Sequence, residues 1–255
     1  MTRITALAVN TCRETIRNRV LLNSLIFAIG IILLSLVVGD WSIYQQAKVI
    51  KDFGLSAMSI FGLLIAVFIG IRLMVQELEQ KTLYNIASKP VHRYEIILGK
   101  YLGLSLTLLI NVAIMAVVLL GAVLLMEGRL DLSLMPAVLL IYIEIMLIVA
   151  FALFYSSFVS PAFAAIFTLI TYVMGHLSGF LIEYVRIYPD RGFHWLLKLL
   201  YYTVPNLERL NLKVRVVEHL GLPPHFTLLA FFYGLSYIGF LLLVTVLIFQ
   251  RKDLK

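Results

Sequence analysis

The chain has 255 residues, of which 62% are hydrophobic and only 14% are charged, and its mean hydropathy is +0.98. Ordinary soluble domains are about half apolar and about a quarter charged, so this composition excludes an ordinary soluble domain and indicates an integral membrane protein. The formal net charge of +7 does not indicate a nucleic-acid partner, because the basic residues are spread over short connections instead of forming one dense patch.

Six apolar runs are long enough to cross a membrane, which takes about 20 helical residues. They are Val20 to Gly39, Leu55 to Val75, Tyr101 to Met126, Leu134 to Val159, Ala162 to Ile182 and Phe226 to Phe249. Leu, Ile, Val and Phe dominate these runs without the alternation of apolar and polar residues that a lipid-embedded barrel needs. The sequence therefore predicts an all-α membrane protein with six transmembrane helices, in one transmembrane domain over residues 1–255.

The segment before the first run predicts an amphipathic helix that lies flat on the membrane surface. Its apolar residues recur every four positions, at Ile4, Ala8, Cys12 and Ile16. Residues 1–19 are thus expected to form an interfacial elbow, which either contacts a cytoplasmic partner or anchors the chain in lipid. The run that follows is longer than the apolar part of a signal peptide and has no small-x-small cleavage site, so we expect a retained span. Cys12 is the only cysteine, which excludes an intrachain disulfide or a CxxC metal site.

The Lys and Arg residues predict which side each connection faces. With both termini in the cytoplasm, twelve lie inside, three lie in the two short outer loops, and six lie in the long connection before the last run. Cytoplasmic connections are enriched in these residues, so we expect a multi-pass protein of the cell membrane, in bacteria the inner membrane, with both termini cytoplasmic.

A polar segment of about 25 residues, Gln76 to Lys100, separates the second and third runs. Two neighbouring helices need only a few residues to connect them, so a segment of this length favours docking of a soluble partner over a plain linker. Pro90 lacks an N–H and disfavours helix at the residue before it, which predicts a short helix, a sharp break and a second helix entering the third run.

The residues of this segment resemble the cytoplasmic loop of the type-2 ABC transporter permeases. The stretch ELEQKTLYNIASKPVHRYEIILGKYLG carries the acidic residue, Thr-Leu pair, Ser-x-Pro-Val, Arg and Leu-Gly-Lys of that loop. Lys81 stands where many members carry a glycine. A basic residue at this position resembles the subgroup that includes the permeases of nitrous-oxide reductase maturation and of gliding motility. A second stretch, Tyr201 to Leu212 (YYTVPNLERLNL), resembles the Pro-Asn-Leu motif before the last span of those permeases.

The resemblance implies a permease subunit that dimerises with a second copy or a related chain and docks a separate ATPase through this loop. The expected contact residues of this coupling segment, 76–100, are Glu77, Glu79, Thr82, Leu83, Ile86, Ser88, Lys89, Pro90 and Arg93. The sequence has no GxxxxGK[ST] loop to hold nucleotide phosphates, so we expect ATP and Mg²⁺ in the partner and no cofactor or catalytic residue here. An amphipathic helix in a groove of the ATPase would use Leu83 and Ile86 as apolar anchors.

The connection of residues 183–225 contains four prolines but also the apolar stretch WLLKLLYY, Trp195 to Tyr202. In the resembled family this region forms short re-entrant helices on the outer side. It is consistent with an outer gate or a contact for an extracytoplasmic accessory protein, and equally with a loop that rests on headgroups.

Two ionisable residues lie inside predicted spans, where a charge is costly: Glu144 in the fourth and His176 in the fifth. Either could line a substrate path. The alternative is structural, with Glu144 protonated or paired and His176 hydrogen-bonded to a neighbouring helix. A metal site is disfavoured, because three or four ligands are usually needed.

The leading hypothesis is the membrane-spanning subunit of an ATP-driven exporter that works by alternating access. A membrane scaffold or anchor that transports nothing is the second hypothesis. An intramembrane enzyme using Glu144 or His176 is the third, and it lacks the supporting motifs GxSxG and HExxH. The apolar spans do not identify a substrate.

Overall fold

The computed structural model describes residues 3–40, 46–79, 93–187, 204–218, 220–221 and 225–251. Within them the chain is helical and contains no strand, which confirms the predicted all-α class. The helices are α1 (Arg3–Ile16), α2 (Arg19–Asp40), α3 (Gln46–Glu79), α5 (Arg93–Glu127), η1 (Leu132–Leu134), α6 (Met135–Ser156), α7 (Pro161–Ile187), η2 (Leu207–Leu210), α9 (Lys213–Val217) and α10 (Phe226–Arg251).

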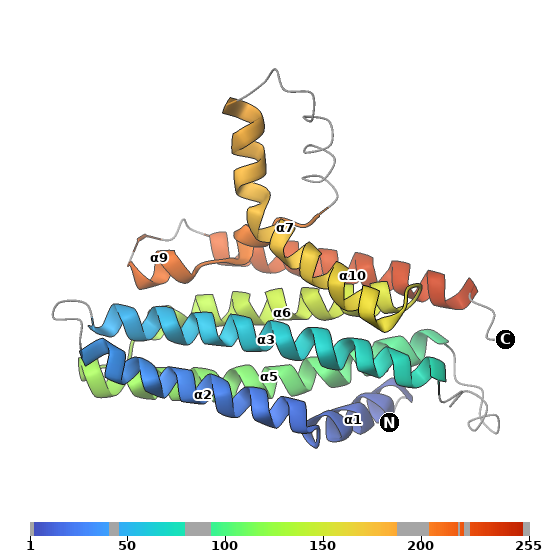
Figure 1. The fold of residues 1–255 in the computed structure, drawn as a ribbon, viewed down its shortest axis with the longest axis horizontal. Coiled ribbons are helices and arrows are strands. Elements are labelled where there is room, and N and C mark those ends of the chain that lie inside the picture. Colours follow the sequence, from blue (N-terminus) through green and yellow to red (C-terminus); the bar gives the residue numbers. More distant parts are fainter. Residues whose placement is uncertain are drawn as a thin grey trace.

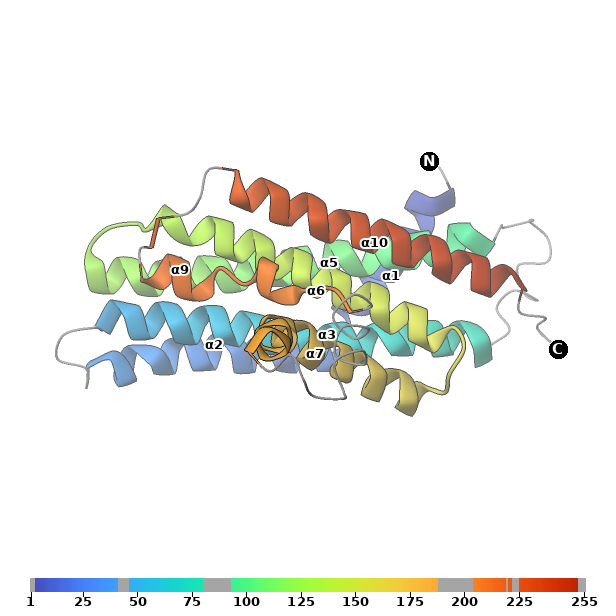
Figure 2. The same cartoon turned by 90° about the horizontal axis from the view of Figure 1, so that it is seen from above.

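The long helices form one bundle along the longest axis of the molecule (Figures 1 and 2). Helix α3 packs against α2, α5 and α6, and α10 packs against α6. Helix α6 is the most buried of the candidate spans. By length and composition, five described helices can cross a membrane, and the bent pair of α1 and α2 raises this number to six. The first predicted span, Val20 to Gly39, coincides with α2 of this bent pair.

Proline and glycine set the ends of several helices. Pro136 and Pro161 stand in the first turns of α6 and α7, where the missing N–H costs no hydrogen bond. Gly128 ends α5, because its φ of +67° turns the backbone into the left-handed region that stops a helix. Helices α3 and α5 have 34 and 35 residues, and at 1.5 Å per residue each is about 50 Å long, longer than the roughly 30 Å hydrocarbon core.

The amphipathic helix predicted at the N-terminus is α1, which ends at Ile16 and meets α2 at an angle of 61°. Thr11, Cys12 and Thr15 of α1 are buried, whereas Ile16 is exposed on the surface of the protein. That this helix lies on the membrane with Ile16 in its apolar face stays a prediction. The buried face lies against α5, where Gly103 admits the backbone of Ala8. A Cβ at position 103 would lie 2.5 Å from the Ala8 carbonyl oxygen.

Helix α7 follows the bundle only over its first part, and its C-terminal part turns away sideways (Figures 1 and 2). It extends to Ile187, so the fifth helix is longer than the predicted run and includes the first residues of the 183–225 connection. The described part of that connection, 204–218, forms η2 and α9, which pack on α3, α6, α7 and α10. Leu207, Leu210 and Val216 are buried there, so this part packs on the bundle. The stretch Trp195 to Tyr202 lies outside the described residues.

Candidate functional site

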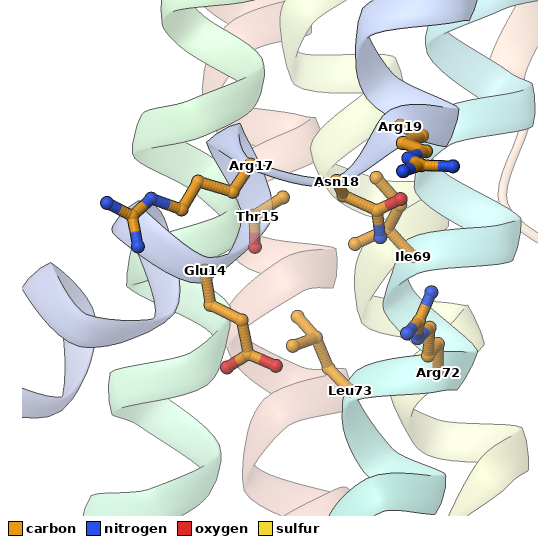
Figure 3. A pocket seen from close by; sticks show the side chains of 8 residues that line it. All are labelled: Glu14, Thr15, Arg17, Asn18, Arg19, Ile69, Arg72 and Leu73. Carbon is orange, nitrogen blue, oxygen red and sulfur yellow. The ribbon is translucent and has the colours of Figure 1, made fainter.

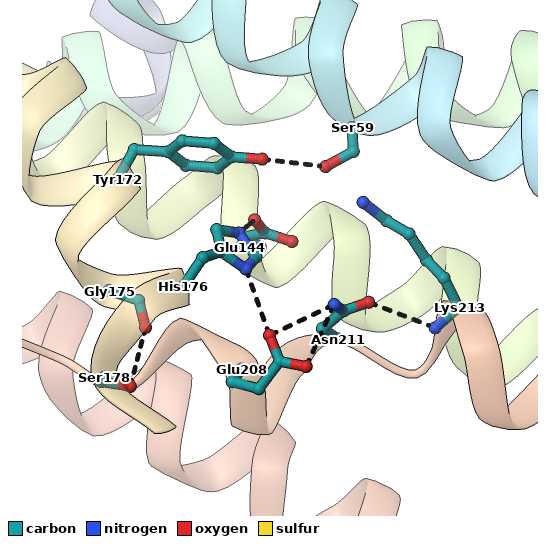
Figure 4. Close-up of polar contacts among 9 residues, drawn as sticks. All are labelled: Ser59, Glu144, Tyr172, Gly175, His176, Ser178, Glu208, Asn211 and Lys213. Atoms are coloured by element: carbon teal, nitrogen blue, oxygen red, sulfur yellow. Dashed lines mark hydrogen bonds and ion pairs between the residues drawn. The ribbon is translucent and has the colours of Figure 1, made fainter. Parts of the chain in front are cut away.

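Glu144 and His176, predicted separately, face each other across α6 and α7 (Figure 4). His176 Nε2 lies 2.7 Å from Glu144 Oε1. Glu144 stands about halfway along α6 and its side chain is only 2% exposed, whereas that of His176 is 21% exposed. The other oxygen of Glu144, Oε2, has no hydrogen-bond partner among the described residues. The structure therefore brings both intramembrane candidates into one site.

The second side of the imidazole faces the segment before the last span. His176 Nδ1 lies 3.4 Å from Glu208 Oε2 of η2, and Asn211 Nδ2 also donates to the Glu208 carboxylate. Glu208 is half exposed, with 51% of its side chain accessible. Gly175, next to His176, allows this approach, because a Cβ there would lie 2.6 Å from Leu207 Cγ. The cluster thus links α6, α7 and η2.

Lys213 and Tyr172 complete the surroundings of Glu144 (Figure 4). Burial lowers the pKa of Lys213, and the negative charges of Glu144 and Glu208 oppose that shift. The centroids of the Tyr172 and His176 rings lie 4.6 Å apart in an edge-on arrangement. The Tyr172 hydroxyl lies 3.4 Å from Ser59 Oγ of α3. We refer to Glu144, His176, Glu208 and Lys213 as the polar cluster.

The geometry of the polar cluster calls for one more proton than a neutral imidazole between two carboxylates carries. A neutral imidazole has one N–H donor and one acceptor nitrogen, but His176 presents both nitrogens to carboxylate oxygens. Both contacts are favourable only when His176 carries two protons, or when one of the two carboxyl groups is protonated. The cluster can therefore hold a proton inside the bundle, where α6, α7 and η2 meet.

No group of three or more His, Cys, Asp and Glu side chains in the described ranges is arranged to hold a metal ion. The carboxylates of Glu144 and Glu208 contact opposite nitrogens of one imidazole, so the ring separates them. The arrangement suits proton and charge pairing within the protein.

A second charged group ties together the end of the bundle opposite the termini. Lys51 Nζ of α3 lies 2.6 Å from Glu127 Oε1 of α5 and 2.7 Å from Asp131 Oδ2, before η1. Lys51 is only 2% exposed. Burial disfavours the charge on Asp131, but hydrogen bonds from Lys51 and Ser133 outweigh burial and hold its pKa at about 2. These contacts fix the connection between α5 and α6.

The sequence profile of the family described as ABC-2 family transporter protein matches residues 6–254 of the chain. The chain belongs to this family. A search of curated proteins finds no match. The family match covers both resembled stretches and every candidate residue. It makes the chain a multi-pass membrane permease of an ABC transporter, a family that associates with an ABC ATPase subunit. The closer subgroup stays a prediction.

Three of the predicted contact residues of this ABC-2 permease lie in described helices, at the other end of the bundle. Glu77 and Glu79 fall in the last turn of α3, and Arg93 opens α5. The remaining ones lie outside the described residues: Thr82, Leu83, Ile86, Ser88, Lys89 and Pro90. The helices that flank the segment are joined directly, since Lys100 Nζ donates to the Leu73 carbonyl oxygen at 2.7 Å.

Glu208 and Lys213 were not among the predicted site residues of the permease. Glu208 stands in the Pro-Asn-Leu stretch recognised in the sequence, and Lys213 follows it directly. The signal that could have found them is the occurrence of charged residues in and directly after that stretch, in a chain with two ionisable residues inside predicted spans. A one-dimensional pattern does not show that this stretch folds back onto α6 and α7.

Proposed function

We propose that this ABC-2 permease is the membrane-spanning subunit of an ATP-driven exporter. It pairs with a second permease chain, identical or related, and each chain docks an ATPase subunit through residues 76–100. ATP and Mg²⁺ bind in the ATPase, and this chain changes conformation by alternating access. The observation that carries the proposal is the family match over residues 6–254, together with two long helices that lead into the docking segment.

The arrangement of helix ends supports docking at one end of the bundle. The C-terminal end of α3, the N-terminal end of α5, α1 and the C-terminal end of α10 lie at the same end (Figures 1 and 2). The charge distribution favours this end as the cytoplasmic one. Because α3 and α5 are each continuous over about 50 Å, a displacement at the docking segment can be carried through the whole membrane as a rigid-body motion.

The polar cluster supports a role for Glu144 and His176 on the transport path. Charges inside a membrane protein are rare and usually face an interior path, pair with each other or relay protons. Here the pair also reaches η2, through Glu208, and η2 belongs to the connection that the charge distribution favours on the outer side. We assign the cluster the role of a latch that holds residues 204–218 against α6 and α7 in the closed state and releases them when the outer side opens.

Co-expression with candidate ABC ATPase subunits from the same genome tests the proposal. We expect a complex with two permease and two ATPase chains on size-exclusion chromatography with light scattering, and ATP hydrolysis that rises when the permease is added in liposomes. Efflux of a fluorescent probe from inverted vesicles would then give the direction. A complex that hydrolyses ATP but moves nothing would indicate the scaffold alternative, and a permease that never binds the ATPase would refute the docking proposal.

A further inference from the structure

A cavity of about 360 Å³ opens where α1 turns into α2 and both meet α3 (Figure 3). Its walls are the end of α1, the start of α2 and the last part of the α3 span. The lining residues are Glu14, Thr15, Arg17, Asn18, Arg19, Ile69, Arg72 and Leu73. We call it the elbow pocket.

The charges in the elbow pocket are separated. Arg19 and Arg72 lie on one side, Glu14 lies on the opposite side, and Arg17 points outward (Figure 3). Arg19, Arg72 and Glu14 are exposed, and none has an ion pair with another described residue. Two guanidinium groups facing one cavity suit a phosphate, because their N–H donors match its oxygens in pairs.

The pocket lies at the level of a membrane boundary. Arg19 opens α2, and Arg72 stands three residues before the end of the candidate span Gln46–Val75. Helix α1 is bent by 61° from α2, and the end of α1 covers one side of the pocket. Lipid headgroups occupy this depth.

A second groove, of about 560 Å³, adjoins the elbow pocket and is apolar. It runs between α3 and the start of α7, and its lining residues are Phe68, Ile71, Arg72, Val75, Pro161, Ala162 and Ala165. Arg72 lines both hollows, so it stands at the boundary between a polar pocket and an apolar groove. A ligand that fills both must have a charged head and a hydrocarbon tail.

We infer that the elbow pocket binds the headgroup of a phospholipid, with its phosphate between Arg19 and Arg72 and an acyl chain in the apolar groove. The carboxylate of Glu14 faces the same cavity and accepts hydrogen bonds from an ethanolamine ammonium group. A free phosphate would use the two arginines but would leave Glu14 as a repelling charge, and it would leave the groove unused. A choline headgroup has no N–H to donate to Glu14, and a glycerol headgroup has no positive charge for it.

Native mass spectrometry of the purified chain tests the inference, with phosphatidylethanolamine, phosphatidylglycerol or phosphatidylcholine added at equal ratios to detergent. We expect the ethanolamine lipid to be retained best. Arg19→Gln and Arg72→Gln together should lower retention of all three lipids by about tenfold or more, since hydrogen bonds to charged groups are lost. Glu14→Gln should remove only the preference for ethanolamine over glycerol and choline. Soluble glycerophosphoethanolamine should compete poorly, because it has no acyl chain.

The matched control is Arg129→Gln, which removes an arginine whose side chain is 81% exposed at the opposite end of the bundle. It should leave retention and preference unchanged. Equal retention by the double arginine variant and by this control would overturn the inference, as would equal competition by the soluble headgroup. Loss of ATPase binding without loss of lipid in the arginine variant would assign the pocket to the ATPase instead. If the double variant does not fold, the Glu14→Gln preference still decides the result.

Discussion

His176 Nε2 on α7 lies 2.7 Å from Glu144 Oε1 on α6, although the two residues are 32 positions apart in the chain. This pair joins the central helix of the bundle to the helix that turns away from it. Since Glu144 is almost fully buried and its second oxygen has no described hydrogen-bond partner, His176 is the main group that stabilises the carboxylate. Loss of either residue is therefore expected to destabilise the folded protein.

The first prediction concerns this pair. His176→Leu keeps much of the side-chain volume but leaves a buried carboxylate without its nearest donor, which should destabilise the fold by about 2–4 kcal/mol. Adding Glu144→Gln should recover at least about 1 kcal/mol, because the stranded charge is removed. The measurement is a double-mutant cycle of thermal unfolding in one detergent.

Ser236→Ala is the control for this cycle, because the exposed Ser236 hydroxyl on α10 bonds only to carbonyls of its own helix. It should change stability little. Additive effects of the His176 and Glu144 substitutions, within about 0.5 kcal/mol, would contradict the coupling.

The second prediction concerns the contact of α1 with α5. Gly103→Ala would place a Cβ 2.5 Å from the Ala8 carbonyl oxygen and 2.7 Å from Thr11 Cβ, so α1 must move away. Cys12 on α1 is the only cysteine and is 7% exposed, so its labelling by a maleimide reports this movement. We expect labelling to become several times faster and stability to fall by about 1–3 kcal/mol.

Gly121→Ala on the same helix gives the matched comparison. No atom lies within 4 Å of a Cβ at that position, so the substitution should stabilise α5 by up to about 1 kcal/mol and leave Cys12 protected. Slow labelling in both variants would show that α1 does not depend on Gly103.

The helices could be predicted from the sequence because hydrophobic length alone defines a span. The first and last runs coincide with α2 and α10 to within two residues. The second apolar run begins at Leu55, but α3 begins at Gln46. The helix therefore includes polar residues before the run, which hydrophobicity alone does not assign to a span. Lys51, one of them, is buried by Glu127 and Asp131, which come from a distant part of the chain.

The polar cluster could be predicted only in part. A charged residue in an apolar run is visible in the sequence, so Glu144 and His176 could be singled out. Their pairing depends on the rotation of α6 against α7, and the contribution of Glu208 depends on the return of residues 204–218 to the bundle. Apolar runs have little periodicity in a membrane, so they do not specify which faces meet.

The third prediction concerns acid stability at Asp131. Its pKa of about 2 in the folded protein lies below the 3.8 of an unperturbed aspartate, so ionisation favours the folded state. This contribution is complete above about pH 4 and is lost as the pH falls towards 2. Asp131→Asn should remove it, lowering stability at pH 7 by at most about 2 kcal/mol and flattening the unfolding profile between pH 4 and 2.

Glu218→Gln is the comparison for Asp131→Asn. It breaks the Lys48–Glu218 pair at the same end of the bundle, whose side chains are 35% and 42% exposed. An exposed pair contributes about 1 kcal/mol or less, so this variant should leave the profile below pH 4 unchanged. The same flattening in both variants would mean that Asp131 is not responsible.

The fourth prediction concerns the docking segment and follows from the proposed function. Leu83→Asp should place a charge on the proposed apolar anchor, and Pro90→Leu should remove the break between the two predicted helices. In both variants the chain should still insert, because the spans are unchanged, while binding and stimulation of the ATPase fall by about tenfold or more.

Lys48→Gln provides the control for these variants, because Lys48 lies at the other end of the bundle, in the first turn of α3. It should leave ATPase binding intact. Leu83→Glu and Leu83→Met separate charge from shape, since only the charged residue should abolish docking when volume is nearly conserved. ATPase stimulation that is unchanged in Leu83→Asp and in Pro90→Leu would place the ATPase contact elsewhere on the permease.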